Sequence, residues 1–382
     1  MTTPDDRTEL RDLVRRFTQR EIVPNLADWE RVGEVPRSLH QSAAKLGLLG
    51  IGYPTELGGA GGDLIDSITV VDEIIRSGGS SGLIAALFTH GIALPHLLAT
   101  GDPVLIDRYV RPTLAGELIG SLAITEPDGG SDVAALRTTA QRDGDDYLVN
   151  GNKTFITSGV RADFVTTAVR TAPTGHRGLS LLVIDKPSPG FTVTRRLDKL
   201  GWHCSDTAEL SYVDVRVPVG NLVGAEGSAF KQIMFGFAVE RISLAVQACA
   251  TAQRCVELTV DWCRQRTTFG AALITRQVVR HRLVEMARQT AVARAFVWQL
   301  AGRIVAGDPV RASDVAMAKN TAVAACDFVV DAAVQLHGGA GYLNESEVER
   351  HYRDARIMGI GGGTTEIMNE MIAKDLFDAR TA

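Results

Sequence analysis

The chain has 382 residues and a formal net charge of −5, so it is long enough for two or three packed units and lacks the basic excess of a nucleic-acid-binding protein. Its five cysteines are an odd set without a Cys-x-x-Cys pair, which argues against a disulfide framework or a zinc site and is typical of a reducing compartment. The chain starts with polar and acidic residues, so we expect neither a signal nor a transit peptide and a cytoplasmic location.

Residues 1–116 are expected to form an N-terminal helical domain. Apolar residues recur there at three- and four-residue steps, for example at Leu10, Val14 and Phe17. Glycine-rich stretches separate the expected helices. The longest apolar stretch, residues 82–98, is interrupted by polar residues and a proline, so we interpret it as a buried helix and expect no membrane span.

Residues 117–223 are expected to form a small β domain. Apolar and polar residues alternate in this segment, and β-branched residues are enriched. The pair Asn150-Gly151 lies between two short apolar runs, residues 147–149 and 154–156. Because a type I′ turn needs positive φ at both central residues, this pair predicts a β-hairpin.

Residues 224–382 return to the helical period and hold it to the end. The stretches 242–264, 276–306 and 312–336 are long, rich in alanine, valine and leucine, and nearly free of proline. Such stretches favour helices that pack side by side in a bundle and are buried in part by a partner subunit. The chain as a whole is therefore expected to be mainly α with a central β domain.

The usual phosphate-binding and metal-binding motifs do not occur. No expected strand is followed by G-x-G-x-x-G, and G-x-x-x-x-G-K-[ST] is missing, which disfavours a standard nicotinamide or ATP enzyme. The eight histidines are dispersed and form no H-x-x-x-H or H-E-x-x-H pair. We therefore expect no metal site.

Four local patterns remain as candidates for chemistry, and they occupy residues 122–132, 266–270, 335–342 and 353–367. The first is a strand end that runs into a glycine turn, which suits either the edge of a planar heterocycle or a simple reversal of the chain. In the second, Arg266 and Phe269 suit a pyrophosphate and an adenine ring, or an ordinary helix end. Taken singly, each pattern is more typical of a turn or a cap.

Taken in order, the patterns closely resemble those of the acyl-CoA dehydrogenase family. The resemblance covers essentially the whole chain and rests on Ile-Thr-Glu-Pro-x-Gly-Gly-Ser-Asp from Ile124, Asn-Gly-x-Lys from Asn150, Arg-x-x-Phe-Gly from Arg266, Gln-x-x-Gly-Gly-x-Gly-Tyr from Gln335 and Gly-Thr-Thr-Glu-Ile from Gly363. It implies an N-terminal helical domain, a middle β-barrel or sandwich domain and a C-terminal four-helix bundle. It also implies FAD, bound between the middle and C-terminal domains and completed by a neighbouring subunit of a homotetramer or homodimer.

The resemblance carries over to individual positions. Along the flavin and the entering substrate it implies Leu122, Ile124, Thr125, Gly130 and Ser131, with Ser131 also meeting the substrate. At the isoalloxazine ring it implies Phe155, where many members have Trp, together with Ile156 and Thr157. For the FAD of an adjacent subunit it implies Arg266, Phe269, Gln277, Gln335, Gly338 and Gly339, with Thr364 and Glu366 closing the near side.

The expected reaction needs a base. Removing hydrogen from Cα and Cβ of a thioester requires a carboxylate for the α-proton and an oxidant, here flavin N5, for the β-hydride. Many members of the family carry this glutamate at the position of Gly362, whereas long-chain and isovaleryl-type members carry it on the first long C-terminal helix, just before an arginine. The matching residue here is Glu240, followed by Arg241. Glu240 is therefore the candidate base, and the N–H of Gly362 is a candidate donor to the thioester oxygen.

Substrate and acceptor follow from the same resemblance. It implies conversion of acyl-CoA to trans-2-enoyl-CoA in fatty acid metabolism, with an electron-transferring flavoprotein as acceptor. Arg241 is interpreted either as a contact to CoA or as a surface charge. Ala238 stands where many relatives have an acidic residue near the pantetheine arm, so an acyl group on a carrier protein stays open as the substrate.

Two other functions stay open. One is a flavin-dependent oxidase or monooxygenase on the same fold, and the other is a non-catalytic flavin-binding scaffold. Glu240 favours dehydrogenation over both, because monooxygenase relatives need no base for an α-proton and a scaffold needs no carboxylate.

Overall fold

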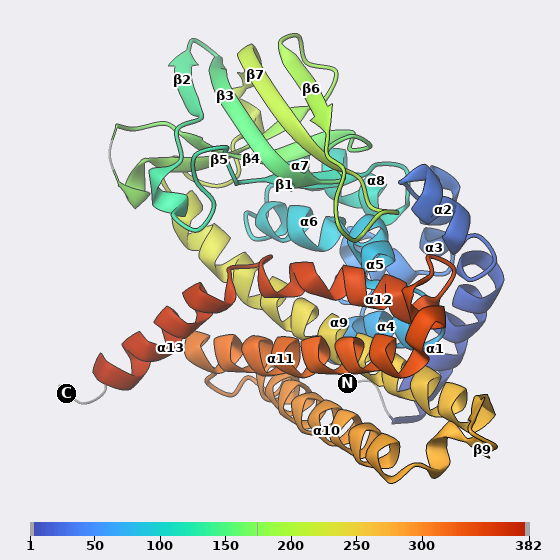
Figure 1. Ribbon diagram of the computed structural model, residues 1–382. Helices are drawn as coiled ribbons and strands as arrows, with labels where there is room; N and C mark the ends of the chain where they lie inside the picture. Colours follow the sequence, from blue (N-terminus) through green and yellow to red (C-terminus); the bar gives the residue numbers. More distant parts are fainter. Residues whose placement is uncertain (1–3, 174, 379–382) are drawn as a thin grey trace.

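The computed structural model describes residues 4–173 and 175–378. A β part lies between two helical parts in chain order, and in space it sits at one end of the molecule, above both of them (Figure 1). Residues 1–3, which belong to the polar start, lie outside the described residues. The first helical part contains α1 (Pro4–Phe17), α2 (Leu26–Val32), α3 (Arg37–Lys45), α4 (Leu64–Arg76), α5 (Ser81–Leu87), α6 (His90–Leu98), α7 (Pro103–Leu105) and α8 (Arg111–Leu114). It also contains the short turns η1 (Thr18–Ile22), η2 (Leu48–Gly50), η3 (Thr55–Leu57) and η4 (Ile106–Val110). The expected all-helical start is confirmed.

The apolar stretch 82–98 is two helices, α5 and α6, and the prediction of one helix is wrong. The chain breaks at Thr89, whose hydroxyl lies 2.6 Å from Ala85 O and 2.6 Å from Ser158 Oγ in the β part. Ser81–Leu98 and Ala229–Gln265 are long and apolar enough to cross a membrane by composition, but 67% and 56% of these windows are buried inside the fold. Such burial is the pattern of core helices.

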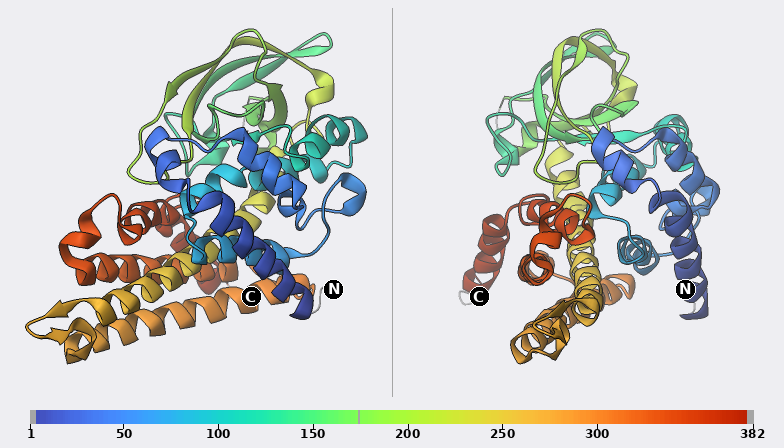
Figure 2. Two further views of the ribbon diagram at one scale, coloured as in Figure 1. Left: turned by 90° about the vertical axis from the view of Figure 1, so that its right-hand side faces the viewer. Right: turned by 45° about the vertical axis from the view of Figure 1, so that its right-hand side comes forward.

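The middle part is a seven-stranded sheet in the order β1-β4-β2-β3-β7-β6, with β5 paired to β4. Its strands are β1 (Gly120–Ala123), β2 (Thr139–Asp143), β3 (Asp146–Thr157), β4 (Phe164–Arg170), β5 (Leu179–Asp185), β6 (Phe191–Arg196) and β7 (Thr207–Pro218), with the turns η5 (Val133–Ala135), η6 (His176–Gly178) and η7 (Val219–Asn221). The sheet curls on itself into a barrel-like layer (Figure 2). Strand β1 runs parallel to β4, and the other main pairings are antiparallel.

The hairpin expected at Asn150-Gly151 is wrong, because both residues lie inside the single long strand β3. Strand β7 pairs with β3 on both sides of this point, and the register shifts between Val149 and Gly151 as at a β-bulge. Gly151 is needed there for space, since a Cβ would lie 2.5 Å from Thr138 Oγ1. Pairing with a distant strand therefore prevails over the local turn preference.

The last part is a helical bundle built from α9 (Ala229–Gln265), α10 (Gln277–Val305), α11 (Ala312–His337), α12 (Glu347–Ala355) and α13 (Thr365–Asp378). Its connections hold β8 (Thr267–Thr268), β9 (Ala271–Ala272), η8 (Leu273–Thr275), η9 (Gly338–Tyr342) and η10 (Arg356–Gly359). Helix α9 runs from beneath the sheet through the whole molecule and packs against α4, α10 and α11 (Figure 1). The predicted fold class, mainly α with a central β domain, is confirmed.

Helix α9 begins at Ala229, well before the start expected from periodicity at residue 242. Its first turns lie in one apolar cluster with strand and helix residues of the other parts, including Ile233 of α9, Leu94 of α6 and Ile124 after β1. A segment that is covered on more than one side shows no single apolar stripe, so its helical period is hard to read.

Candidate active site

Glu240 lies in the interior of α9 and not at a helix start. The side chain keeps some exposed surface, but its carboxyl group is surrounded mainly by protein. Burial raises the pKa of Glu240, and the positive charges of Arg241 and Lys319 oppose that shift without cancelling it. A carboxylate with a raised pKa is suited to take a proton near neutral pH.

A glycine turn, formed by Gly361, Gly362 and Gly363 between η10 and α13, faces Glu240. Gly362 and Gly363 have φ values of 65° and 99°, which favour glycine. A Cβ built on Gly362 would lie 3.6 Å from Glu240 Oε1. Positions 240 and 362, the two alternative places for the family's glutamate, therefore meet at one point in space.

Two cations hold the carbonyl groups of the glycine turn. Arg241 Nε donates to Gly362 O at 2.9 Å, while Lys319 Nζ of α11 donates to Gly361 O at 2.7 Å and Gly363 O at 2.5 Å. The N–H of Gly362 donates to no acceptor among residues 4–173 and 175–378. It is therefore available for a bound molecule beside Glu240.

Arg241 is not a surface charge, because only 6% of it is exposed and it is bound to the glycine turn. Its guanidinium group also lies over the Phe237 ring, 5.5 Å from the centroid. The expected contact with CoA stays a prediction. Sequence reasoning missed Lys319, although a lone lysine in the alanine-rich core face of a long helix is a usable indication of a buried functional cation.

The loop after β1 packs against the first turns of α9. Ile124 is buried, Leu122 is partly buried, and both belong to the apolar cluster that contains Phe237, one turn from Glu240. Gly130 and Ser131 are exposed. The structure therefore brings the start of this loop close to the helix that carries the candidate base.

A buried ion pair anchors this loop to β3. Lys153 Nζ of β3 donates to Glu126 Oε1 at 2.8 Å and to Ile124 O at 3.0 Å, and Lys153 is fully buried. Glu126 also accepts the backbone N–H groups of Arg137 and Thr138. Burial alone would raise the pKa of Glu126, but Lys153 and these hydrogen bonds lower it overall.

The end of β3 presents an aromatic ring to the outside. Phe155 is 67% exposed and has a φ of 60°, an unusual conformation for a residue with a side chain. Its neighbour Ile156 is buried, and Thr157 accepts a hydrogen bond from Ser121 Oγ of β1 through its carbonyl oxygen. A fixed, exposed ring of this kind fits a flat partner that covers it.

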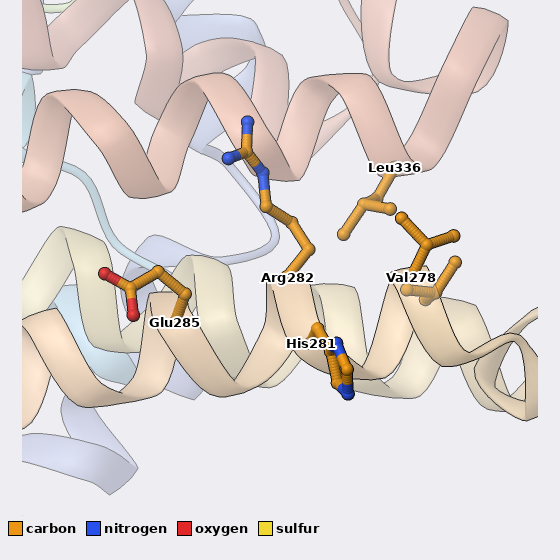
Figure 3. A pocket seen from close by; sticks show the side chains of 6 residues that line it. Val278, His281, Arg282, Glu285 and Leu336 are labelled. Atoms are coloured by element: carbon orange, nitrogen blue, oxygen red, sulfur yellow. The ribbon is translucent and has the colours of Figure 1, made fainter.

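The remaining expected FAD residues lie far from the sheet, at the other end of the bundle. Phe269 is 99% exposed on the α9–α10 connection, and Trp262 of α9 stacks on His337 of α11 at 5.0 Å. A hollow between α10 and α11 lies beside them and is lined by Val278, Val279, His281, Arg282, Glu285 and Leu336 (Figure 3). Arg266, Gln277, Gln335, Gly338 and Gly339 are exposed around this end. Within one chain this end of the bundle lies away from β1 and the loop that follows it (Figure 1).

Thr364 and Glu366 lie at the start of α13, directly after the glycine turn. Thr364 Oγ1 accepts the N–H of Ile367, and hydrogen bonding at the helix start lowers the pKa of exposed Glu366. These two residues therefore follow directly on the glycine turn that faces Glu240, and their expected contact with FAD stays a prediction. Among the described residues, no group of three or more histidine, cysteine, aspartate or glutamate side chains could hold a metal ion.

Comparison with known proteins assigns all three parts. The models of the acyl-CoA dehydrogenase N-terminal, middle and C-terminal domains match residues 4–117, 121–215 and 227–377. The chain belongs to the acyl-CoA dehydrogenase family. It is 37% identical to the mitochondrial long-chain specific acyl-CoA dehydrogenase of Sus scrofa over 369 residues, which are 96% of this chain and 85% of that protein.

Solved structures are also similar to this chain in fold. A probable acyl-CoA dehydrogenase from Mycobacterium abscessus is 63% identical with a TM-score of 0.96, over 98% of this chain and 99% of that one. The prolyl acyl carrier protein oxidase AnaB is 28% identical with a TM-score of 0.93, over 98% and 100% of the two chains. As a member of the family, this chain is an FAD-dependent oxidoreductase that acts on CH–CH groups.

The residues present fit FAD. Phe155 offers an exposed ring near the end of β3, and the loop with Gly130 and Ser131 offers exposed backbone and hydroxyl groups. This loop is joined to β3 by the hydrogen bond from Thr154 N–H to Thr125 O. The unpaired N–H of Gly362 and the carboxylate of Glu240 are on the helical side. Phe155 and this loop would hold FAD, and the cofactor would supply the oxidant for a substrate bound beside Glu240.

Proposed function

We propose that this acyl-CoA dehydrogenase oxidises the Cα–Cβ bond of a fatty acyl-CoA to the trans-2-enoyl thioester, with Glu240 as the base. The proposal rests on the position of Glu240 Oε1, which lies 3.6 Å from the place that a Cβ on Gly362 would occupy. Glu240, on α9, therefore supplies the carboxylate that many members of the family carry at the position of Gly362. Its raised pKa supports the role, because the ionised form is then a stronger base.

In the proposed mechanism, the thioester lies between the glycine turn and the sheet. The N–H of Gly362 donates to the thioester oxygen and stabilises the negative charge that develops there when the α-proton leaves. Glu240 takes this proton on its carboxylate and holds it until product leaves. Bound FAD would supply the acceptor for the β-hydride.

One second candidate is favoured by a specific observation. The prolyl acyl carrier protein oxidase AnaB has the same fold over nearly the whole chain. Ala238 removes an acidic contact expected near a pantetheine arm. A carrier-bound acyl group with dioxygen as acceptor is therefore the alternative that a test must separate from acyl-CoA with an electron-transferring flavoprotein.

We expect the purified yellow protein to lose its visible flavin absorption when an acyl-CoA is added without oxygen. A panel of straight and branched acyl-CoA esters, scored by the rate of bleaching, gives the preferred chain. Recovery of the colour only on addition of electron-transferring flavoprotein supports a dehydrogenase, whereas rapid recovery in air supports an oxidase. A protein that keeps FAD but is bleached by neither free nor carrier-bound acyl thioesters contradicts the proposal and favours the scaffold.

We further propose a homodimer or homotetramer in which each chain completes the FAD site of its neighbour. Support comes from the exposure of Arg266 and Phe269 at the end of the bundle away from the sheet (Figure 1). An exposed aromatic ring and a guanidinium group are typical contacts for an adenine and a pyrophosphate. Burial of apolar residues such as Val278 and Val284, which are 77% and 65% exposed, would stabilise the assembly.

The double variant Arg266→Ala with Phe269→Ala is expected to bind FAD about 10- to 100-fold more weakly, since it loses a charge-assisted hydrogen bond and an aromatic contact. The measurement is the FAD content after dialysis, with light scattering for the molar mass. Arg264→Ala is the matched control, because Arg264 lies on the same helix end and pairs with Asp261. Full FAD content in the double variant would contradict the shared site.

The location is proposed to be the cytoplasm. All five cysteines are free and buried in the fold. Unpaired thiols are typical of proteins from a reducing compartment.

A further inference from the structure

The glycine turn is held by two buried cations that come from different helices. Lys319 of α11 binds the carbonyl groups of Gly361 and Gly363, and Arg241 of α9 binds the carbonyl group of Gly362 that lies between them. Three consecutive carbonyl oxygens therefore accept hydrogen bonds from cations. The N–H of Gly362 has no acceptor within the described ranges 4–173 and 175–378, and it is the group expected to meet the thioester oxygen.

Lys319 is an unusual residue for this place. Its side chain is fully buried, and its hydrogen-bond acceptors are two neutral carbonyl groups. Burial and the charge of Arg241 lower the pKa of Lys319 to about 8, against the opposing effect of Glu240, so the amine is mostly charged at pH 7. A neutral amide could donate to the same carbonyls without the desolvation cost of a charge. The charge itself therefore needs a reason.

The reason lies in Glu240. The charges that act on this carboxyl group are Arg241 on α9 and Lys319 on α11, since the glycines of the turn carry none. Both cations favour the ionised carboxylate, which is the form that accepts a proton. Lys319 thus contacts the backbone that offers the N–H donor and also acts on the base through its charge.

We propose that Lys319 is a positioning residue for α-proton transfer: its buried ammonium group fixes the glycine turn so that Gly362 N–H meets the thioester oxygen, and it keeps Glu240 ionised. This inference rests on the proposed function. The role belongs to the proton-transfer half of the reaction, so it can be measured without net oxidation of a substrate.

The test compares Lys319→Met with Lys319→Arg, which keeps the charge. For the Met variant we expect anaerobic bleaching by acyl-CoA about 10- to 100-fold slower at pH 7, because a small displacement of the donor weakens transition-state binding. The fall in rate toward acid pH should also move to higher pH, because loss of a nearby positive charge raises the pKa of Glu240. The Arg variant should keep the wild-type pH profile and recover part of the rate.

A second readout isolates the proton transfer. An acyl-CoA with sulfur in place of its β-carbon can lose its α-proton but has no hydride to give, so its α-hydrogen exchange in D2O reports the base alone. We expect this exchange to slow in Lys319→Met as much as bleaching does. Lys374→Met is the matched control, because Lys374 is exposed on neighbouring α13 and should leave both rates unchanged.

FAD content and the unfolding temperature are measured for every variant. If Lys319→Met does not fold, Lys319→Gln, which keeps the donors without the charge, takes its place and should still shift the pH profile. An unchanged pH profile with normal exchange per bound FAD would overturn the role of Lys319. Absence of bleaching and exchange in the wild-type protein would instead overturn the proposed function, so the two failures are distinguishable.

Discussion

The Glu240→Gln variant is expected to keep FAD and its fold, but the rate at which acyl-CoA bleaches its flavin should fall at least about 100-fold. The reason is that general base catalysis contributes roughly 10²- to 10⁴-fold to such rates. The amide fills the same space beside the glycine turn but cannot accept the α-proton. The measurement is the first-order rate of anaerobic bleaching in a stopped-flow instrument. Exchange of the α-hydrogen in D2O should be lost together with bleaching.

Glu257→Gln provides the control for the Glu240 variant. Glu257 lies on the same helix and pairs with Arg76 of α4, away from the glycine turn, so its replacement should leave the bleaching rate unchanged. Bleaching of Glu240→Gln at the wild-type rate would rule out Glu240 as the base.

Moving the carboxylate gives an independent check on the geometry. Because positions 240 and 362 meet, Glu240→Gly combined with Gly362→Glu should recover part of the rate that Glu240→Gly alone loses. Recovery will be incomplete for two reasons. A side chain at a φ of 65° costs about 1–2 kcal/mol, and its Cβ would lie 2.9 Å from Leu244 Cδ1, which must move.

Lys153→Met is expected to lower the free energy of unfolding by about 3–5 kcal/mol, because it leaves the buried carboxylate of Glu126 without its cation. The loop that carries Ile124 and Thr125 also loses its anchor, so FAD should bind more weakly. The measurements are urea unfolding at a fixed protein concentration and FAD content.

The double variant Lys153→Met with Glu126→Gln tests the reason for that loss. With no buried charge left behind, it should be less destabilised than Lys153→Met alone. If the free energy of unfolding of Lys153→Met is within about 1 kcal/mol of the wild-type value, the ion pair contributes little to the stability of the loop.

Much of this protein could be predicted from local sequence. The change of period from helical to alternating and back gave the fold class, because each period reflects which face of an element is buried. The ordered motifs from Ile124 to Gly363 gave the family, and the glycine at 362 together with a glutamate at 240 gave the candidate base. These features are encoded over a few neighbouring residues each.

Other features depend on contacts between distant segments. The turn preference of Asn150-Gly151 failed because β7 pairs along the whole of β3. The early start of α9 was hidden because the first turns of this helix are covered on several sides. Local preferences of this kind contribute less to the free energy of folding than burial and pairing over a long strand or helix.

The sequence by itself determined the alternation of helical and β segments, the family and the residue types available for the reaction. Only the tertiary structure decided that Glu240 faces Gly362, that Arg241 binds the turn 121 positions away instead of facing solvent, and that Lys319 joins them from a third segment. The physical reason is that proton transfer and charge stabilisation depend on distances of a few ångströms between side chains, and chain packing sets those distances.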